Sequence, residues 1–382
     1  ANSGADTLAV LQSPAGQYTQ SIVTVDATLG NLTGVDFGFN FDTIVNSNDS
    51  GQGSLRQFIL NSNLLTDNAA LAQDGLSAGA ETSIFMIPGG SDPLGRPADA
   101  GYTGSPPDGG SGSAFVIRPT SVLPAITDGD TVIDGGTQTA YSGDSNPAAA
   151  DVTTGPEIIV DHQRTLAGNI LDVDVDGVTI AGIGLTGAAN GHALAFESIA
   201  NVVDPLVVRD VTIVDSGSSA VIADTITRDG SGPLYTVQIS DCVMREAGLD
   251  DNVSDVVNAL DVQGLQVQNS RLLRSSAMGI DLVQNISDVL IENNWIEGNG
   301  SGGVQPAGIG LRTNVSNVTI RGNTITGNQA DAIMLYGSAA NVTISQNSIY
   351  ANGDLGIDLQ NGTDIDGDGV TANDGGAGDD GD

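Results

Sequence analysis

The sequence predicts an all-β protein: a right-handed parallel β-helix, or solenoid, with a short N-terminal capping helix and an N-terminal β extension. The main observation is a repeat, because the pattern apolar-x-apolar-x-x-Asn-x-apolar aligns on seven consecutive units of the second half. A second observation is that short alternating strands follow each unit without an amphipathic helix between them. The third is composition: glycine makes up 52 of 382 residues and aromatic residues 4%, which suits many turns around a narrow aliphatic core.

The seven units begin 24 to 31 residues apart, from Val178 to Val342. One strand cannot bury its apolar face alone, but coils stacked about 4.8 Å apart build a continuous core. The Asn position falls at a bend, where Asn tolerates left-handed dihedrals and can hydrogen-bond its counterpart in the next coil. We therefore expect a structural ladder, in which the lone cysteine is a small buried spacer rather than a redox or nucleophilic group. Its members are Cys242, Ser270, Asn294, Asn323 and Asn347.

We expect three regions: an N-terminal β extension (1–41), a β-helix (42–362) with its cap at 42–65, and an Asp-rich tail (363–382). Within the cap, Ser54 is a plausible helix N-cap, and Leu55, Phe58 and Ile59 form one apolar face. A helix placed there would cover the open end of the solenoid and block edge-to-edge pairing.

The N-terminal extension contains a strictly alternating segment whose apolar residues are Val35, Phe37, Phe39 and Phe41. These rings need an apolar partner surface, and two interpretations stay open. The segment packs along the first coils of the same solenoid, or it completes a sheet in a neighbouring subunit and links molecules head to tail.

Charge narrows the classes of partner. The chain has 47 acidic residues against 11 Arg and no Lys, a net charge of −36. This net charge excludes binding to the phosphates of nucleic acids and to anionic membranes, because both need a basic protein surface. No run of about 18 apolar residues predicts a transmembrane segment, and one cysteine gives no disulfide framework.

The tail has the one-three-five acidic spacing and the sixth-position glycine of a calcium loop. We expect Ca²⁺ to be held by Asp364, Asp366, Asp368 and Asp374. The alternative is a solvated acidic tail that serves as a linker.

The stretch from Val45 to Gln57, which contains Asn-Asp-Ser-Gly-Gln-Gly-Ser-Leu-Arg-Gln, resembles the cap of secreted, adhesin-like bacterial cell-surface proteins with parallel β-helix repeats. The phrases at 131–136 and 356–359 are similar to phrases in the same proteins, and residues 35–42 resemble the final strand of their immunoglobulin-like repeats. The resemblance implies an extracellular, cell-surface location and partners that are copies of itself, other surface proteins or glycans.

Our main functional hypothesis is a non-enzymatic structural or adhesive module of a bacterial surface protein, able to self-assemble into filaments through its N-terminal strand and stabilised by calcium. The alternative is a polysaccharide-binding or -cleaving enzyme, because β-helices host lyases and glycosidases. We expect no enzyme: there is no Lys to act as a base, and only Gly191-His192-Ala193 and Asp250-Asp251 faintly match catalytic phrases. His162 and His192 are predicted at the surface and in a turn.

Overall fold

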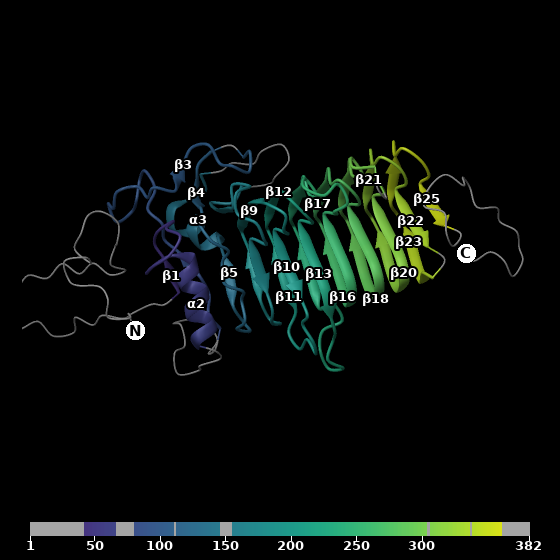
Figure 1. Ribbon diagram of the computed structural model, residues 1–382, viewed down its shortest axis with the longest axis horizontal. Helices are drawn as coiled ribbons and strands as arrows, with labels where there is room; N and C mark the ends of the chain where they lie inside the picture. Colours follow the sequence, from purple (N-terminus) through teal and green to yellow (C-terminus); the bar gives the residue numbers. More distant parts are fainter. Residues whose placement is uncertain are drawn as a thin grey trace, which may run out of the picture.

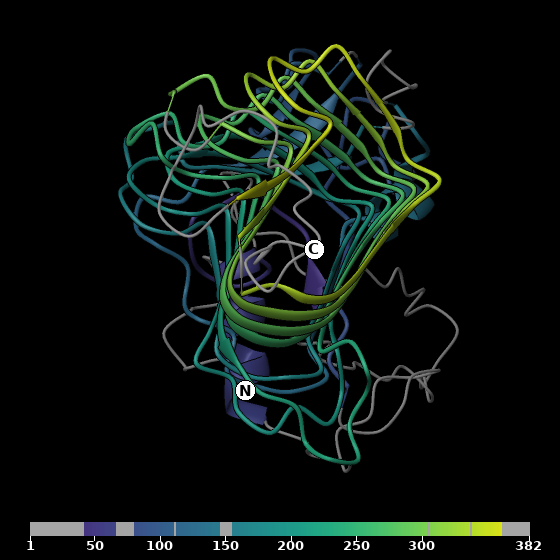
Figure 2. The same cartoon turned by 90° about the vertical axis from the view of Figure 1, so that its right-hand side faces the viewer.

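A computed structural model describes residues 42–65, 80–110, 112–145, 155–303, 306–336 and 338–360. These residues wind into a rod of stacked coils with a helix, α2 (Leu55–Leu65), at its N-terminal end (Figure 1). Viewed along the rod, the successive coils superpose (Figure 2). The predicted parallel β-helix with its N-terminal helix is therefore confirmed.

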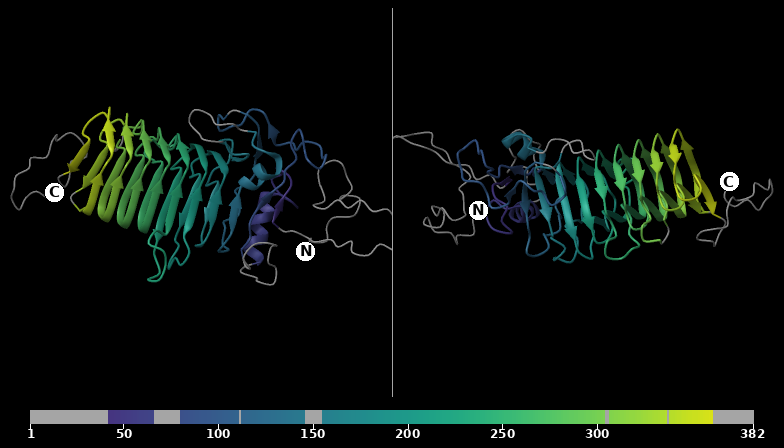
Figure 3. Two further views of the ribbon diagram at one scale, coloured as in Figure 1. Left: turned by 180° about the vertical axis from the view of Figure 1, so that it is seen from behind. Right: turned by 90° about the horizontal axis from the view of Figure 1, so that it is seen from above.

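Each coil contributes strands to three faces, which we call sheets 1, 2 and 3; views from behind and above show the strands stacked along the rod (Figure 3). Sheets 1 and 2 are continuous, because three long strands bend through both. Sheet 1 contains β5 (Val132–Asp134), β8 (Thr179–Ala181), β11 (Leu206–Arg209), β14 (Val237–Ser240), the C-terminal halves of β16 (Val257–Gln268), β18 (Ile280–Glu292) and β20 (Ile309–Arg321), and β23 (Ala340–Ser345). Sheet 2 contains β7 (Leu171–Val173), β10 (Leu194–Glu197), β13 (Val221–Ile226), the N-terminal halves of those long strands, β22 (Ile333–Tyr336) and β25 (Ile357–Gln360).

Sheet 3 is the separate face of the rod. It contains β4 (Ala114–Ile117), β6 (Ile158–Asp161), β9 (Ile183–Ala188), β12 (Thr212–Ser216), β15 (Val243–Arg245), β17 (Arg271–Leu273), β19 (Trp295–Glu297), β21 (Thr324–Thr326) and β24 (Ser348–Tyr350). All these strands pair in parallel, whereas β3 (Tyr102–Thr103) pairs antiparallel with β4 at one edge. Near the cap, β1 (Thr43–Ile44) and β2 (Ile84–Phe85) form a separate parallel pair.

The core is a set of inward-facing aliphatic columns. In sheet 1, Val208 lies between Ile180 and Ile239 in neighbouring coils, and all three side chains are fully buried. Each such side chain contributes about 1.5–3 kcal/mol by leaving water. Because side chains alternate along a strand, the residues between them face outward. Core packing therefore decides which residues form the outer faces.

The bend between sheets 1 and 3 has a left-handed backbone one residue before the predicted ladder. Asn269, Asn293 and Gly322 have φ of 50°, 57° and 68°. The ladder residues that follow them are not left-handed. The left-handed conformation that Asn tolerates therefore occurs one residue before the ladder. At the ladder position itself, Asn is favoured by its hydrogen bonds to neighbouring coils.

The capping helix packs as its sequence predicts. The hydroxyl of Ser54 accepts a hydrogen bond from the backbone N–H of Gln57 at 3.2 Å, which is an N-cap bond. Leu55, Phe58 and Ile59 are buried in the main core. The helix therefore closes the N-terminal end of the apolar interior.

A second helix, α3 (Gly136–Ser142), lies in a stretch whose Gly, Ser and Asp content predicts a long loop. Its position is fixed by Gln138, whose amide group exchanges two hydrogen bonds with the backbone of Ile87, at 2.8 and 3.0 Å. This helix depends on contacts about 50 residues away in the chain. Local periodicity therefore could not reveal it.

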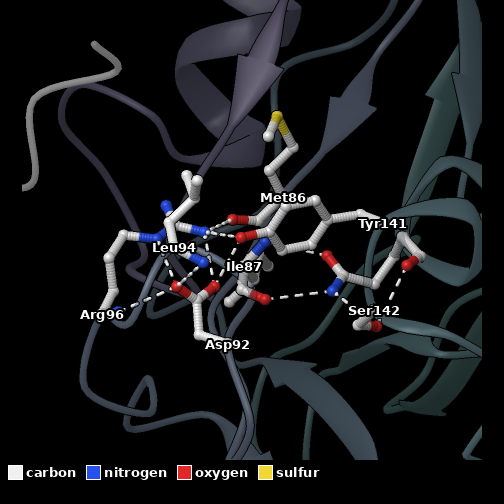
Figure 4. Close-up of polar contacts among 8 residues, drawn as sticks. Met86, Ile87, Asp92, Leu94, Arg96, Tyr141 and Ser142 are labelled. Atoms are coloured by element: carbon white, nitrogen blue, oxygen red, sulfur yellow. Dashed lines mark hydrogen bonds and ion pairs between the residues drawn. The ribbon is translucent and has the colours of Figure 1, made fainter. Parts of the chain in front are cut away.

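A buried ion pair fixes the loop after β2 beside α3 (Figure 4). The side chains of Arg96 and Asp92 are 7% and 0% exposed and approach to 3.0 Å. Arg96 also donates to the carbonyl of Met86 at 2.6 Å, and Tyr141 donates to Asp92 at 2.5 Å. Burial alone would raise the pKa of Asp92, but the hydrogen bonds from Arg96 and Tyr141 lower it to about 2.

Within the described residues, no helix is long and apolar enough to cross a membrane.

Candidate functional site

The outer face of sheet 2 carries carboxylates in its first three coils. We call Asp172, Asp174, Glu197 and Asp224 the acidic cluster. Asp172 points outward because its neighbours in β7 face the core, and the same alternation turns Glu197 and Asp224 outward in β10 and β13. The register places Glu197 directly beside Asp224.

Burial and neighbouring carboxylates favour the protonated forms of Glu197 and Asp174. Partial burial is the main cause that raises the pKa of Glu197, followed by repulsion from Asp172, Asp224 and Asp174. Burial and then Asp172 raise the pKa of Asp174. Among the described residues, no arginine forms an ion pair with a member of the acidic cluster. Glu197 therefore keeps a proton to a higher pH than an ordinary glutamic acid.

His192 lies at the edge of the acidic cluster, in the turn that leads into β10. Its backbone N–H donates to Asn169 at 2.8 Å. Burial lowers the pKa of its imidazole, against the smaller opposing effects of a hydrogen bond with the backbone of Ser219 and of the charges of Asp251 and Asp172. Gly191 lets this turn approach the preceding coil, because a Cβ there would lie 2.4 Å from the carbonyl oxygen of Gly168. The turn thus holds a neutral imidazole beside the carboxylates, as the sequence predicts for its position.

The loop 248–254 flanks this region, and its two adjacent acids have structural partners. Asp250 forms an ion pair with Arg164 and accepts a hydrogen bond from the N–H of Asn190 at 2.7 Å. Its carboxylate lies against Gly217, and a Cβ atom at position 217 would be 2.2 Å from the Oδ2 of Asp250. Asp250 therefore reaches past the coil of Gly217 to Arg164 and Asn190 in earlier coils. This structural role replaces the weak catalytic interpretation of the Asp250-Asp251 pair.

Asp251 stabilises the turn of the same loop. It accepts hydrogen bonds from the N–H of Val253 at 3.0 Å and from the hydroxyl of Ser254 at 2.5 Å. Both oxygens of this carboxylate are thus used locally.

Further along the outer face of sheet 2, Asp255 and Asp281 are buried. Asp255 accepts hydrogen bonds from the N–H of Met278 and the amide of Asn258, both at 2.7 Å. Asp281 forms an ion pair with Arg312. Burial raises the pKa of Asp281 to about 6 and, with repulsion from Asp281, raises the pKa of Asp255. These groups hold the coils together and do not meet solvent.

The predicted ladder residues are linked from coil to coil. The backbone N–H of Cys242 donates to the hydroxyl of Ser270 at 3.1 Å, and the N–H of Ser270 donates to Asn294 at 2.9 Å. The amides of Asn294 and Asn323 each donate to the next member, Asn323 and Asn347 respectively, at 3.0 Å. The column therefore holds neighbouring coils together.

Cys242 is buried in this column. Desolvation raises the pKa of its thiol to about 12, and the sulfur lies 3.0 Å from the carbonyl of Ser240. A thiol in this state is neither a nucleophile nor a metal ligand at neutral pH.

A second ladder, at the bend from sheet 3 to sheet 2, was missed in the sequence. Asn299 donates to Asn328 at 2.9 Å, and Asn328 donates to Asn352 at 2.9 Å. The signal was present, because each lies five residues after an Asn of the first ladder.

The surface prediction for His162 is wrong, because its side chain is buried, with a relative exposure of 1%. Burial lowers the pKa of its imidazole. Ile158 and Val160 of β6 lie in the main core, so the alternation along the strand turns His162 toward the interior as well.

The other predicted residues lie outside the described part of the chain. This holds for the calcium ligands Asp364, Asp366, Asp368 and Asp374 and for the assembly strand Val35, Phe37, Phe39 and Phe41. Among the described residues, no group of three or more His, Cys, Asp or Glu is arranged to hold a metal ion.

Comparisons with known proteins agree with a parallel β-helix protein. A family model described as periplasmic copper-binding protein (NosD) matches residues 208–374, which is less than half of the chain. A search of curated proteins found no significant match.

Several solved structures are similar in fold. The full-length tailspike protein 2 of an Escherichia coli O157:H7 bacteriophage is 11% identical with a TM-score of 0.42, over 63% of this chain and 34% of that one. A mutant of the periplasmic alginate epimerase AlgG is 16% identical with a TM-score of 0.30, over 59% and 54%. PfbA, a surface adhesin of Streptococcus pneumoniae, is 10% identical with a TM-score of 0.19, over 64% and 82%. The chain thus spans about a third of the tailspike and about half of the epimerase.

These comparisons contradict the prediction that the chain is not an enzyme. One similar structure is an epimerase, and part of tailspike protein 2 is described as an enzymatically active domain. The absence of lysine from the sequence does not by itself exclude catalysis.

The described residues do not fit the copper of the family description. Both histidines lie outside the matched stretch, and Cys242 and Met244 are buried in the core. Met278 and Met334 are buried with Ala307 in a small apolar cluster.

Proposed function

We propose that the chain is a polysaccharide-processing β-helix protein that acts on a glycan lying across the outer face of sheet 2. The observation that supports this most is the raised pKa of Glu197 inside a group of carboxylates that has no arginine partner. Glycoside cleavage needs one protonated carboxylic acid and one ionised carboxylate on either side of the bond. The acidic cluster supplies both.

In this proposal Glu197 is the general acid and Asp172 the second carboxylate. Glu197 donates its proton to the glycosidic oxygen as the bond to the anomeric carbon breaks. Asp172 either attacks that carbon or removes a proton from the attacking water. His192 lies at the edge of the acidic cluster, and its neutral imidazole adds no charge there.

The charge of the acidic cluster also limits the substrate. A polyuronic chain would be repelled by four carboxylates without a cation. A neutral or amino-sugar polysaccharide would not, so we propose that class of substrate.

The test is release of reducing ends from a panel of neutral, amino-sugar and uronic polysaccharides. Glu197→Gln should lower the rate by about 10²–10⁴-fold, the usual contribution of general acid catalysis. Asp241→Asn is the matched control, because Asp241 is exposed at a left-handed bend that Asn tolerates. Equal rates for Glu197→Gln and the wild type would disprove the assignment, as would no product from any polymer.

We also propose that the protein works in the bacterial envelope or outside the cell. The family description and the matched epimerase both name the periplasm. Fractionation of native cells would test this, and recovery with the cytosol would contradict it.

Calcium binding at the tail and self-association through residues 35–41 are retained as proposals. Calcium binding is supported by the seven Asp between 364 and 382, where there is no basic residue. A melting temperature that is the same in excess calcium and in chelator would refute it. The second is tested by electron microscopy of the chain with and without residues 1–41, where identical monomers would refute it.

A further inference from the structure

We propose that the outer face of sheet 3, from Arg271 to Tyr350, is a binding platform for a neutral saccharide chain. It lies on a different face from the acidic cluster. This inference shares only its ligand class with the proposed function, so each can fail alone.

The observation behind it is where aromatic side chains meet solvent. Trp295, the single Trp of the chain, is 36% exposed, and Tyr350 is 50% exposed. Among the described residues these are the exposed aromatic side chains, while the large rings of the core are buried. Both lie on sheet 3, in β19 and β24, two coils apart. An exposed aromatic pair on one face of a protein with so few rings indicates a contact surface.

The register makes this surface flat and continuous. Trp295 lies between Arg271 on one side and Thr324 on the other, and Ser348 follows Thr324 in the next coil. At about 4.8 Å per coil, the row is about 14 Å long. Tyr350 ends a parallel row that contains Glu297 and Thr326.

The indole of Trp295 is held in place. The guanidinium of Arg271 lies 5.8 Å from the centre of its ring. Its Nε1–H donates to the carboxylate of Glu297 at 2.6 Å. A ring fixed by two polar partners loses little freedom when a ligand stacks on it.

The neighbours of the rings favour a sugar over a protein partner. Protein interfaces surround an aromatic anchor with apolar side chains, whereas Trp295 is next to Thr324 and Glu297, and Ser348 lies one coil beyond Thr324. A pyranose ring has one apolar face of C–H groups, which suits the negative face of an indole, and a rim of hydroxyls, which suits hydroxyl and carboxylate groups.

The charge of the platform favours a neutral ligand. Arg245 and Arg274 both form ion pairs with Glu246, at 3.1 and 3.5 Å. The indole of Trp295 is close to the guanidinium of Arg271 and donates a hydrogen bond to Glu297. Positive and negative groups alternate, so the face neither attracts nor repels a polyanion strongly.

The platform ends where a long loop lies on sheet 3. Arg245, one coil before Arg271, donates a hydrogen bond to the carbonyl of Asp108, which is 137 residues away in sequence. A chain bound on Trp295 would therefore extend from this loop toward the C-terminal coils, along the row of Thr324 and Ser348.

The single Trp makes the test direct, because all indole fluorescence comes from Trp295. Neutral oligosaccharides of the gluco-, manno- and xylo-series are titrated into the full chain. We expect a saturable change in emission with the series that binds, and roughly tenfold weaker binding of that series, by calorimetry, for Trp295→Ala. Tyr350→Ala, which keeps the fluorophore, should weaken binding several-fold.

Two controls separate this site from others. Val203→Ala removes an exposed apolar side chain (55% exposed) from a different face and should bind as the wild type does. Glu197→Gln should also keep the fluorescence change, because it lies on sheet 2. The proposal is overturned if no saccharide changes the emission, if Trp295→Ala binds as tightly as the wild type, or if the emission follows protein concentration instead, which would indicate self-association.

Discussion

Substituting Asn323 by Ala should destabilise the rod more than the same change at any exposed Asn. The Oδ1 of Asn323 accepts hydrogen bonds from the backbone N–H and the side-chain amide of Asn294, at 2.8 and 3.0 Å. Its own amide donates to Ile291 and Asn347, at 2.9 and 3.0 Å. The side chain is 1% exposed, so water cannot replace these partners.

Alanine at 323 removes the acceptor of the buried Asn294 N–H and one donor to the Ile291 carbonyl. Each buried group left without a partner costs about 1–3 kcal/mol, so we expect a loss of about 2–4 kcal/mol in the free energy of unfolding. Asn347→Ala is the matched control. It makes equivalent bonds at the last coil of the ladder but is half-buried, so water can enter, and we expect a loss of about 1 kcal/mol or less.

The assay is urea unfolding followed by far-ultraviolet circular dichroism, with hydrogen exchange of the Asn294 amide as a local readout. In the Asn323 variant that amide should exchange faster, while amides near the cap should not change, because coils contact mainly their neighbours. Equal losses in the two variants would refute the reasoning, since burial would then not decide the cost of an unpaired group.

Three further predictions follow from the same kind of argument. Arg96→Met leaves the buried Asp92 without its charged partner and should cost about 3–5 kcal/mol, seen as earlier proteolysis around residues 88–101; cleavage at the wild-type rate would contradict it. The pKa of Asp281 is raised to about 6, so its contribution to stability is full below its unfolded pKa of about 3.9 and is lost as pH rises through 6. The difference in unfolding free energy between the wild type and Asp281→Asn should therefore change between pH 4 and pH 7, and a constant difference would disprove it. The thiol of Cys242 should react with iodoacetamide at pH 8 only after denaturation, because its pKa is about 12 in the fold; labelling of the native chain would show that the column opens.

The fold could be predicted from the sequence because each repeat unit is a pattern of neighbouring residues. Val178 and Val342 bracket a pattern whose period shows both the strands and their stacking. Ser54 and the apolar face of α2 were likewise readable, since an N-cap and a helical face need only neighbouring residues. The α3 helix was not, because Gln138 and Ile87 meet only after the early coils form.

The candidate site was hidden for a similar reason. Asp172, Glu197 and Asp224 belong to three coils of unequal length, and only the register of β7, β10 and β13 brings them together. Spacing in the sequence pointed instead to Asp250 and Asp251, which are adjacent but are used in an ion pair and in a turn. Adjacent acids in a chain are thus a poor guide to acids that face one ligand.

Some side-chain contacts of the rod span a whole coil, whereas others join only neighbouring coils. The two parts of the rod that contain these contacts should differ in how easily a coil can be added or removed. Asp250 connects with Arg164 and Asn190 across a whole coil, and Arg228 reaches Asp288 at 3.2 Å across another. Beyond Asp288, the asparagine ladders join neighbouring coils, at separations of 24 and 29 residues. A duplication or deletion of one whole coil there would preserve every ladder, whereas the same event between Arg164 and Asp288 would break a bridge. Evolution and protein engineering can therefore lengthen or shorten this molecule at its C-terminal end, one coil at a time.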